Sequence, residues 1–183
     1  MCNAALIGLG AKPIMALNEN NDAAAACNWR YEAVRNATLR RHNWSCAKKR
    51  QILARDSDAP AFKWTYSYTL PGDCLRVRDV FGNDGITQVG YEVVGKFIHT
   101  DSAYVYLEYT AKITDPTVLD SLCLECMAAF LAAELADYLT GSSTERERQT
   151  KIAYVKLQEA ILVDAQTSGR RASVAVDTWV GAR

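Results

Sequence analysis

Cysteine spacing is the first pattern in this chain that could carry chemistry. The sequence contains six cysteines, and two of them, Cys123 and Cys126, stand three positions apart. A CxxC pair can supply half of a zinc site or act as a redox pair, but a structural zinc site needs two more ligands, and the sequence has no second CxxC and no HxxxH pattern. On a helix these two positions share one face. We therefore interpret both as small core side chains and expect the six thiols to be reduced.

Histidines and carboxylates give little support for an enzyme. The two histidines, His42 and His99, lie on different predicted elements, and the GxSxG, HExxH and P-loop patterns are absent. Asp79, Asp84 and Asp101 fall in or near predicted loops and could form the acid pair of a glycoside hydrolase, but nothing in the sequence sets their separation. His42 is expected to end a helix and to interact with its terminal carbonyls. We therefore predict no catalytic residue, cofactor or metal.

A basic run is the strongest local charge feature. Residues 28–55 contain eight Lys or Arg against one acid. Such a run is usually a solvated face, although it could also pair with an acidic subunit or line a passage for DNA. The candidate lumen or inter-subunit basic face consists of Arg30, Arg35, Arg40, Arg41, Lys48, Lys49 and Arg50.

Composition limits the class of protein and its partners. The 183 residues are 49% hydrophobic and 23% charged, which is typical of one globular domain with or without an appendage. The formal net charge of zero argues against bulk electrostatic binding to nucleic acid or anionic membrane. The start lacks the basic region of a signal peptide, and four acids interrupt the most apolar segment, 117–139. We expect synthesis and folding in a cytoplasm and no membrane partner.

Apolar spacing and capping residues predict four helices. Asp22 is the expected cap of the second helix, Asp115-Pro116 opens the third and Gly141 closes it, and Ser142-x-x-Glu145 has the form of a capping box for the fourth. The third is apolar nearly all round, so it should lie inside a bundle or between subunits. A short link makes the third and fourth antiparallel neighbours. The predicted ranges are 4–9, 22–42, 115–141 and 142–166.

Alternation predicts strands in the middle third. Aromatic and aliphatic residues occupy every even position of 62–70, and Pro71-Gly72-Asp73 is expected to reverse the chain into a second strand at 74–81. Polar breaks at 82–85 and 100–102 are expected to be hairpin connections. Further strands are predicted at 47–54, 91–94, 96–99 and 104–110.

The predicted fold class is α+β, with a long-helix bundle of about four helices and an inserted small antiparallel β-sheet or barrel. The helical part is assigned to 1–46 and 111–169, the β domain to 47–110, and a C-terminal arm to 170–183. Chain ends are commonly disordered, but exposed valines and a tryptophan are costly, so the arm could add a strand or plug to a neighbour. Its candidate interface residues are Arg170, Arg171, Val174, Val176, Trp179 and Val180.

The order of several motifs resembles one known family. They are an Ala-Leu-x-x-Leu-Gly-x-x-Pro-Ile opening (5–14), a helix ending at His42-Asn43-Trp44, Lys-Arg-x-x-Leu-Ala (49–54), Tyr-x-Leu-Pro-x-Asp-Cys-Leu-Arg-Val (68–77), and Tyr109 with Thr114-Asp115-Pro116 before two alanine-rich helices. Together they resemble the tail tubular protein A, or head-to-tail adaptor (connector), family of tailed bacteriophages. The resemblance covers about residues 3–168.

The resemblance implies a structural virion protein. Its expected partners are further copies of itself in a ring of twelve subunits, the portal protein, and the tail nozzle or next tail protein, with genomic DNA passing non-specifically through the lumen during ejection. By this analogy the helical part faces the portal, the sheet faces the tail, and 170–183 is an interaction arm. The basic segment and the acidic third helix are expected to be complementary, within one subunit or between neighbours. The alternatives are a tail component with accessory cell-wall hydrolase activity and a small metal or redox protein built on Cys123 and Cys126.

Overall fold

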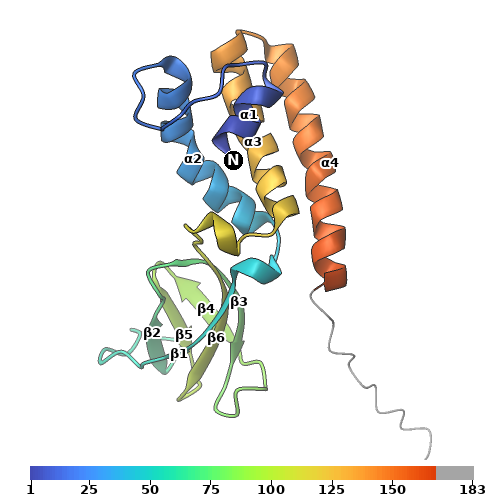
Figure 1. Ribbon diagram of the computed structural model, residues 1–183. Helices are drawn as coiled ribbons and strands as arrows, with labels where there is room; N and C mark the ends of the chain where they lie inside the picture. The colour runs from blue at the N-terminus through green and yellow to red at the C-terminus, as the bar shows by residue number, and fades with distance from the viewer. Residues whose placement is uncertain (168–183) are drawn as a thin grey trace, which may run out of the picture.

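The computed structural model describes residues 1–167 as an α+β fold with its helices at one end and its strands at the other (Figure 1). Within that range there are four α-helices and two three-stranded antiparallel sheets. The helices precede and follow the strands in the sequence, so the chain passes from helices to sheets and back. The predicted C-terminal arm, 170–183, lies outside the described residues.

The first two helices are α1 (Cys2–Gly8) and α2 (Asp22–Arg41). The cap of α2 is Asn21, whose side chain accepts the Ala24 N–H at 2.8 Å, so Asp22, which was predicted as the cap, instead lies in the first helical turn. An acid there still complements the positive end of the helix dipole. His42 terminates α2, as the sequence predicted.

Helix α3 (Ser121–Thr140) begins later than predicted. Asp115 and Pro116 start only a short 3-10 turn, η2 (Pro116–Val118), in which Asp115 accepts the Thr117 N–H at 2.9 Å. The chain is then extended through Leu119, and Asp120 caps α3 by accepting the Leu122 N–H. Two acids five residues apart can both cap, and the second one starts the long helix. Gly141 ends α3 in a left-handed conformation (φ 65°), as predicted.

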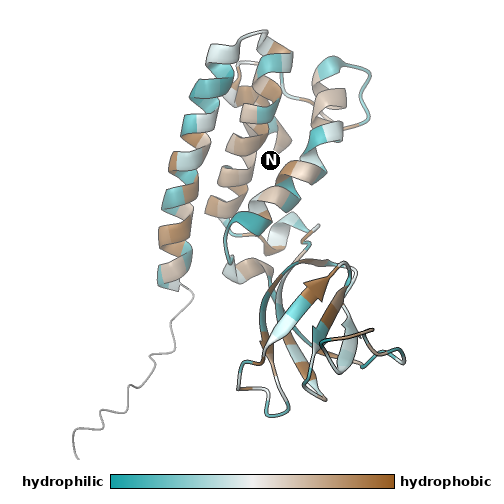
Figure 2. Cartoon of the chain, turned by 180° about the vertical axis from the view of Figure 1, so that it is seen from behind, coloured by the Kyte–Doolittle hydropathy of each residue, from teal (hydrophilic) through white to brown (hydrophobic). Residues whose placement is uncertain are grey.

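Helix α4 (Ser143–Thr167) follows α3 after a short turn and packs along it. Ser142 Oγ accepts the Glu145 N–H at 3.2 Å, which confirms one half of the capping box. The Glu145 carboxylate instead binds Arg148 and Gln149 in the next turn. Helix α3 contacts all three other helices and is buried along most of its length, as its composition predicted. Figure 2 shows α3 apolar almost throughout, whereas polar and apolar segments alternate along α4.

The strands form two sheets. In sheet A the order is β1-β6-β3, and in sheet B it is β2-β5-β4. Apolar side chains from both sheets, among them Leu53, Tyr68, Val80, Ile98 and Leu107, are buried in the common core. The strand bounds are Lys48–Leu53 (β1), Tyr66–Thr69 (β2), Cys74–Phe81 (β3), Tyr91–Val94 (β4), Phe97–Thr100 (β5) and Val105–Ala111 (β6).

The sheets also meet at two corners. Arg55 bridges to Tyr68, with the Asp56 N–H donating to the Ser67 carbonyl at 2.9 Å. Phe81 bridges to Gln88 at the other corner. Each sheet therefore has an edge joined to the other.

The strand predicted at 62–70 is wrong at its N-terminal half. Only Tyr66–Thr69 pairs, because Lys63 has a left-handed backbone (φ 73°) and turns the chain, leaving Phe62 82% exposed. Trp64 also lies outside the paired strand, and its indole Nε1–H donates to the Glu92 carboxylate at 2.8 Å. Period-two alternation cannot detect such a turn, since it records only residue types.

The turn predicted at Pro71-Gly72-Asp73 is confirmed, but the two strands that it connects do not pair. The Cys74 N–H donates to the Pro71 carbonyl at 2.9 Å, whereas β2 and β3 belong to different sheets. The break at 100–102 likewise carries the chain from sheet B to sheet A. The two-residue hairpin is instead β4–β5, where Gly95 adopts φ 62°, the conformation such turns require.

Candidate functional site

The junction between helices and sheets is centred on Asp164, near the end of α4. Its carboxylate accepts the Ser45 N–H at 3.1 Å and the Ser45 hydroxyl, and lies 3.1 Å from His42 Nε2. These contacts attach the last turns of α4 to the segment that leads into β1. The expectation that His42 interacts with helix carbonyls is therefore wrong, because a carboxylate from a distant helix takes that place.

Arg78 of β3 crosses the same junction from the sheet side. Its Nη2 donates to the Trp44 carbonyl at 2.6 Å and its Nε to Thr110 Oγ1 at 2.9 Å. Trp44 is itself buried and donates its Nε1–H to the Thr38 carbonyl in α2 at 3.0 Å. Burial lowers the pKa of Arg78, and the nearby Glu108 carboxylate opposes this shift. The guanidinium thus connects sheet A to the end of α2 through hydrogen bonds at fixed positions.

Each basic residue of α2 has different contacts. Arg30 pairs with Glu134 of α3. Arg35 is buried, with its guanidinium 5.3 Å from the ring centroid of Tyr31. Arg41 lies 4.4 Å above the ring centroid of Phe130, also on α3. The side chain of Arg40 lines a shallow surface hollow with Ala33, Asn36, Ala37 and Leu75.

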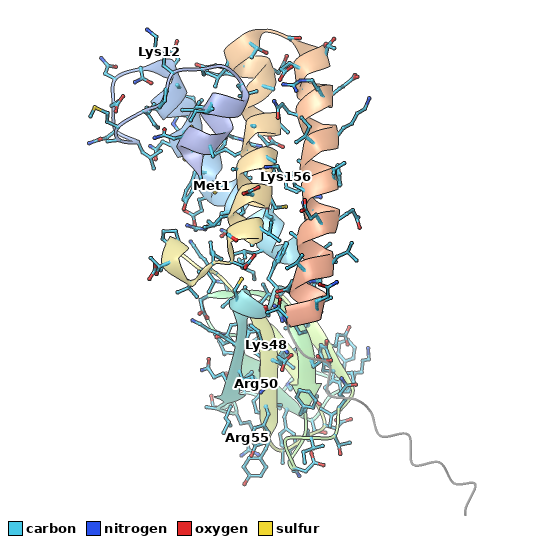
Figure 3. The ribbon with its side chains drawn as sticks, turned by 45° about the vertical axis from the view of Figure 1, so that its right-hand side comes forward. Met1, Lys12, Lys48, Arg50, Arg55 and Lys156 are labelled. Carbon is cyan, nitrogen blue, oxygen red and sulfur yellow. The ribbon has the colours of Figure 1, made fainter. Side chains whose placement is uncertain are left out.

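The basic residues of β1 alternate between the two faces of sheet A. Lys48 and Arg50 each lie 2.8 Å from the Glu108 carboxylate on the outer face, whereas Lys49 lies 2.7 Å from Asp73. Burial alone would raise the pKa of Glu108, but hydrogen bonds from Lys48 and Arg50 outweigh it and hold the pKa below its usual range. Figure 3 shows Lys48 and Arg50 along the sheet. Among the described residues, Arg30–Glu134 is the only ion pair between the basic run and α3, which Arg41 also contacts through Phe130. Exposure of these residues to a lumen or a neighbour stays a prediction.

An apolar groove lies on the outer face of sheet A, at the end farthest from the helices. Ile52, Tyr106 and Phe81 stand side by side, because Tyr106 pairs with Ile52 on β1 and with Phe81 on β3. Ile86, from the loop after β3, completes a hollow of about 390 Å³, and the Arg50–Glu108 ion pair lines its rim toward the helices. The placement of Ile52 two residues after Arg50 on β1 is a weak signal for this face, but residue types along one strand do not predict the groove, which also needs β3 and β6.

The thiol that hydrogen-bonds to Cys123 is not the one that the CxxC spacing suggests. Cys123 and Cys126 are both buried on α3, as expected for core residues, but the hydrogen-bonding neighbour of the Cys123 thiol is Cys46, which precedes β1. That hydrogen bond lowers the pKa of Cys46 to about 6, although burial acts in the opposite direction. Cys2 and Cys27 form a second hydrogen-bonded pair, and mainly burial raises the pKa of Cys27 to about 12. All six thiols are free.

The carboxylates of the three acids considered for hydrolysis accept hydrogen bonds from nearby side chains or backbone N–H groups. Asp84 accepts hydrogen bonds from the hydroxyl and N–H of Thr87 and from the Ile86 N–H, which lower its pKa to about 2. Asp101 binds the N–H and hydroxyl of Thr65, and Asp79 accepts from Gln88. The general acid of a glycoside hydrolase needs a raised pKa, whereas the second carboxylate of the pair is ionised. The lowered pKa of Asp84 therefore does not suit the role of general acid.

The described part of the chain contains no metal-binding cluster and no membrane-spanning helix. In residues 1–167, no group of three or more His, Cys, Asp or Glu side chains could hold a metal ion, and no helix has the length and apolarity needed to cross a membrane. The candidate interface residues Arg170, Arg171, Val174, Val176, Trp179 and Val180 lie outside that range. No protein-family model matches this chain, and a search of curated proteins found no match.

Proposed function

We propose that this protein is a structural subunit of a phage virion, a head-to-tail adaptor that forms a ring, expected to have twelve copies, between the portal vertex and the tail nozzle. The observation that carries the proposal is the end-to-end arrangement of helices and sheets, fixed by Asp164 and Arg78. A spacer between two different partners needs two distinct ends held at a constant distance. The order of motifs along the sequence, which resembles the adaptor family, supports the same assignment.

In this proposal the four helices act as a bundle and the two sheets as a small barrel. The bundle faces the portal and the barrel faces the tail, while 170–183 serves as an interaction arm. The central position of α3 among the helices supports the bundle, and the two corner bridges between the sheets support the barrel. The protein is assigned to the head-to-tail junction of the virion, after synthesis in the host cytoplasm, and is not an enzyme.

The charge pattern suits a channel through which DNA must move. Strong binding to DNA requires many cations that can each neutralise a phosphate. Here Arg30, Lys48, Lys49 and Arg50 already contact acids of the same chain. A lumen lined by such pairs would hold DNA weakly, which favours passage over retention.

The decisive experiment mixes the purified protein with the portal protein at low and high salt, followed by electron microscopy and mass measurement. A twelve-fold ring stacked on the portal is the expected result. A monomer without affinity for the portal at either salt concentration would overturn the proposal. Deleting 170–183 should leave a folded chain that fails to join the portal, and equal binding by the truncated protein would reject the arm.

The Cys46–Cys123 pair favours a second candidate, a thiol-based redox protein. A pKa near 6 for Cys46 would leave much of this thiol ionised at neutral pH, the form that reacts with disulfides. Titration with a thiol reagent should then show one fast thiol, lost in Cys46→Ser, if this function operates. Reaction of Cys46 no faster than that of Cys74, whose pKa burial raises to about 11, would remove the candidate.

A further inference from the structure

The groove on the outer face of sheet A is lined by apolar side chains that are exposed or only half-buried. Ile52 is 63% exposed and Ile86 is 78% exposed, and the ring of Tyr106 and the side chain of Phe81 between them are only half-buried. Clustered apolar side chains of this kind usually mark a binding surface. A hollow of about 390 Å³ is large enough to accept an aromatic side chain.

The last turn of α4 lies at the opposite end of the same face. Asp164 contacts Ser45, three residues before β1 begins at Lys48. Arg78 lies at the same part of the sheet, because its Nε donates to Oγ1 of Thr110, the residue that pairs with Lys48. The Asp164 carboxylate interacts electrostatically with its guanidinium. Figure 3 shows α4 ending next to the part of the sheet where Lys48 is labelled. The chain therefore leaves α4 at one end of a face whose other end is the groove.

The distance to the groove is short compared with the chain that follows α4. Lys48 and Ile52 are four positions apart on β1, which corresponds to about 13 Å along the strand. Trp179 stands twelve positions after Thr167, the last residue of α4, and twelve residues can span up to about 40 Å. The segment can reach the groove without being fully extended.

The composition of this segment fits the groove. Trp179 is flanked by Val176 and Val180, and no other large apolar residue follows α4 apart from Val174. Tryptophan is one of the residues enriched among the side chains that anchor protein interfaces. Valine and tryptophan also favour the extended backbone that lies flat against a sheet.

We propose that the C-terminal segment 170–183 docks on the outer face of sheet A of its own chain, with Trp179 inserted between Ile52, Phe81, Ile86 and Tyr106. The groove then shields the apolar side chains of the arm from water. The proposal does not depend on the adaptor function, since it concerns one isolated chain.

The test uses the full chain labelled with 5-fluorotryptophan. The four tryptophans give four fluorine signals, and Trp179→Phe identifies the relevant one. The difference in chemical shift between H2O and D2O reports solvent exposure, with Trp29 (77% exposed) and Trp44 (1% exposed) as internal references. We expect the Trp179 signal to show less than half of the Trp29 difference and to be independent of protein concentration.

Ile86→Asn should return the Trp179 signal to the exposed value, because it places a polar side chain in the groove wall. Val155→Asn, at a 68% exposed position on α4, is the matched control and should leave the signal unchanged. An unaltered Trp44 signal will show that each variant is folded. The proposal is overturned if Trp179 matches Trp29 in the unmodified chain, or if Ile86→Asn has no effect. It is also overturned if the signal changes on dilution, which would assign the groove to the arm of a second copy.

Discussion

The two ends of this protein are stabilised in different ways. The helical end is organised around one apolar element, α3, which the other three helices cover. The sheet end contributes fewer buried apolar side chains to the common core, and its outer face carries ion pairs such as Lys48–Glu108. Stability at the helical end should therefore depend on packing volume, whereas the sheet end and the junction should depend more on hydrogen bonds and charge.

The largest expected effect comes from the centre of the helical end. Leu131→Ala removes a fully buried side chain from α3 and should lower the free energy of unfolding by about 3 kcal/mol. Leu162→Ala, at a 64% exposed position on α4, is the control and should cost less than about 0.5 kcal/mol. Urea unfolding followed by circular dichroism measures both. A cost for Leu131→Ala no larger than that of the control would show that α3 is not the centre of this end.

The junction should show the next largest effect. Arg78→Ala leaves the buried Trp44 carbonyl without its guanidinium donor, which should cost about 2 kcal/mol. It should also let the two ends unfold separately, so that calorimetry shows a broadened or split transition instead of one. Arg146→Ala, on the exposed surface of α4, serves as the control. One sharp transition with an unchanged midpoint in Arg78→Ala would mean that other contacts couple the ends.

Charge at the sheet end should make stability depend on pH. Because the pKa of Glu108 is lower in the folded chain than in the unfolded chain, its contribution is fully present above the unfolded pKa, near 4.3, and is lost as the pH falls through the folded pKa. Glu108→Gln should cost about 1 kcal/mol at pH 7 and progressively less in acid. Unfolding measured from pH 7 to pH 3 tests this, with Glu147→Gln on exposed α4 as the control. An equal cost of Glu108→Gln at every pH would contradict a role for the charge.

The smallest effect is expected at the surface of the helical end. Arg30 and Glu134 are 49% and 42% exposed at their side chains, so their pair should contribute less than about 1 kcal/mol. A double-mutant cycle with Arg30→Ala and Glu134→Ala measures the coupling, and added salt should reduce it. Coupling above the Glu108→Gln cost would reverse the proposed difference between the two ends.

Most helix positions could be predicted because their signals are local. The left-handed Gly141, the Ser142 cap and the apolar surface of α3 each depend on residues within one or two turns. The error at Asp115 has the same origin, since Asp115 and Asp120 are equally good caps by sequence and only the packing of α3 selects the second. Strands β3, β4 and β6 were also placed correctly, within a residue of their ends.

The candidate site was harder to predict than the elements that carry it. Cys46 and Cys123 are 77 positions apart, and Ser45 and Asp164 are 119 apart. The CxxC spacing pairs Cys123 with Cys126, which is its neighbour on the helix and not its hydrogen-bonding partner. Likewise, the basic run is one feature in the sequence but divides in space, because successive residues of β1 point to opposite faces of the sheet.

The sequence by itself determined that the chain combines helices and strands, where most of these elements lie, and which residues are apolar enough to enter the core. It did not determine where α3 begins or that only half of the strand predicted at 62–70 would pair. Tertiary structure alone decided which strands pair, so that β2 and β3 separate into two sheets, and which side chains meet at Asp164, Arg78 and the groove. The physical reason is range. Backbone conformation, capping and periodicity are set by neighbours a few residues away, whereas pairing and burial of polar groups depend on the free energy of the whole packed chain.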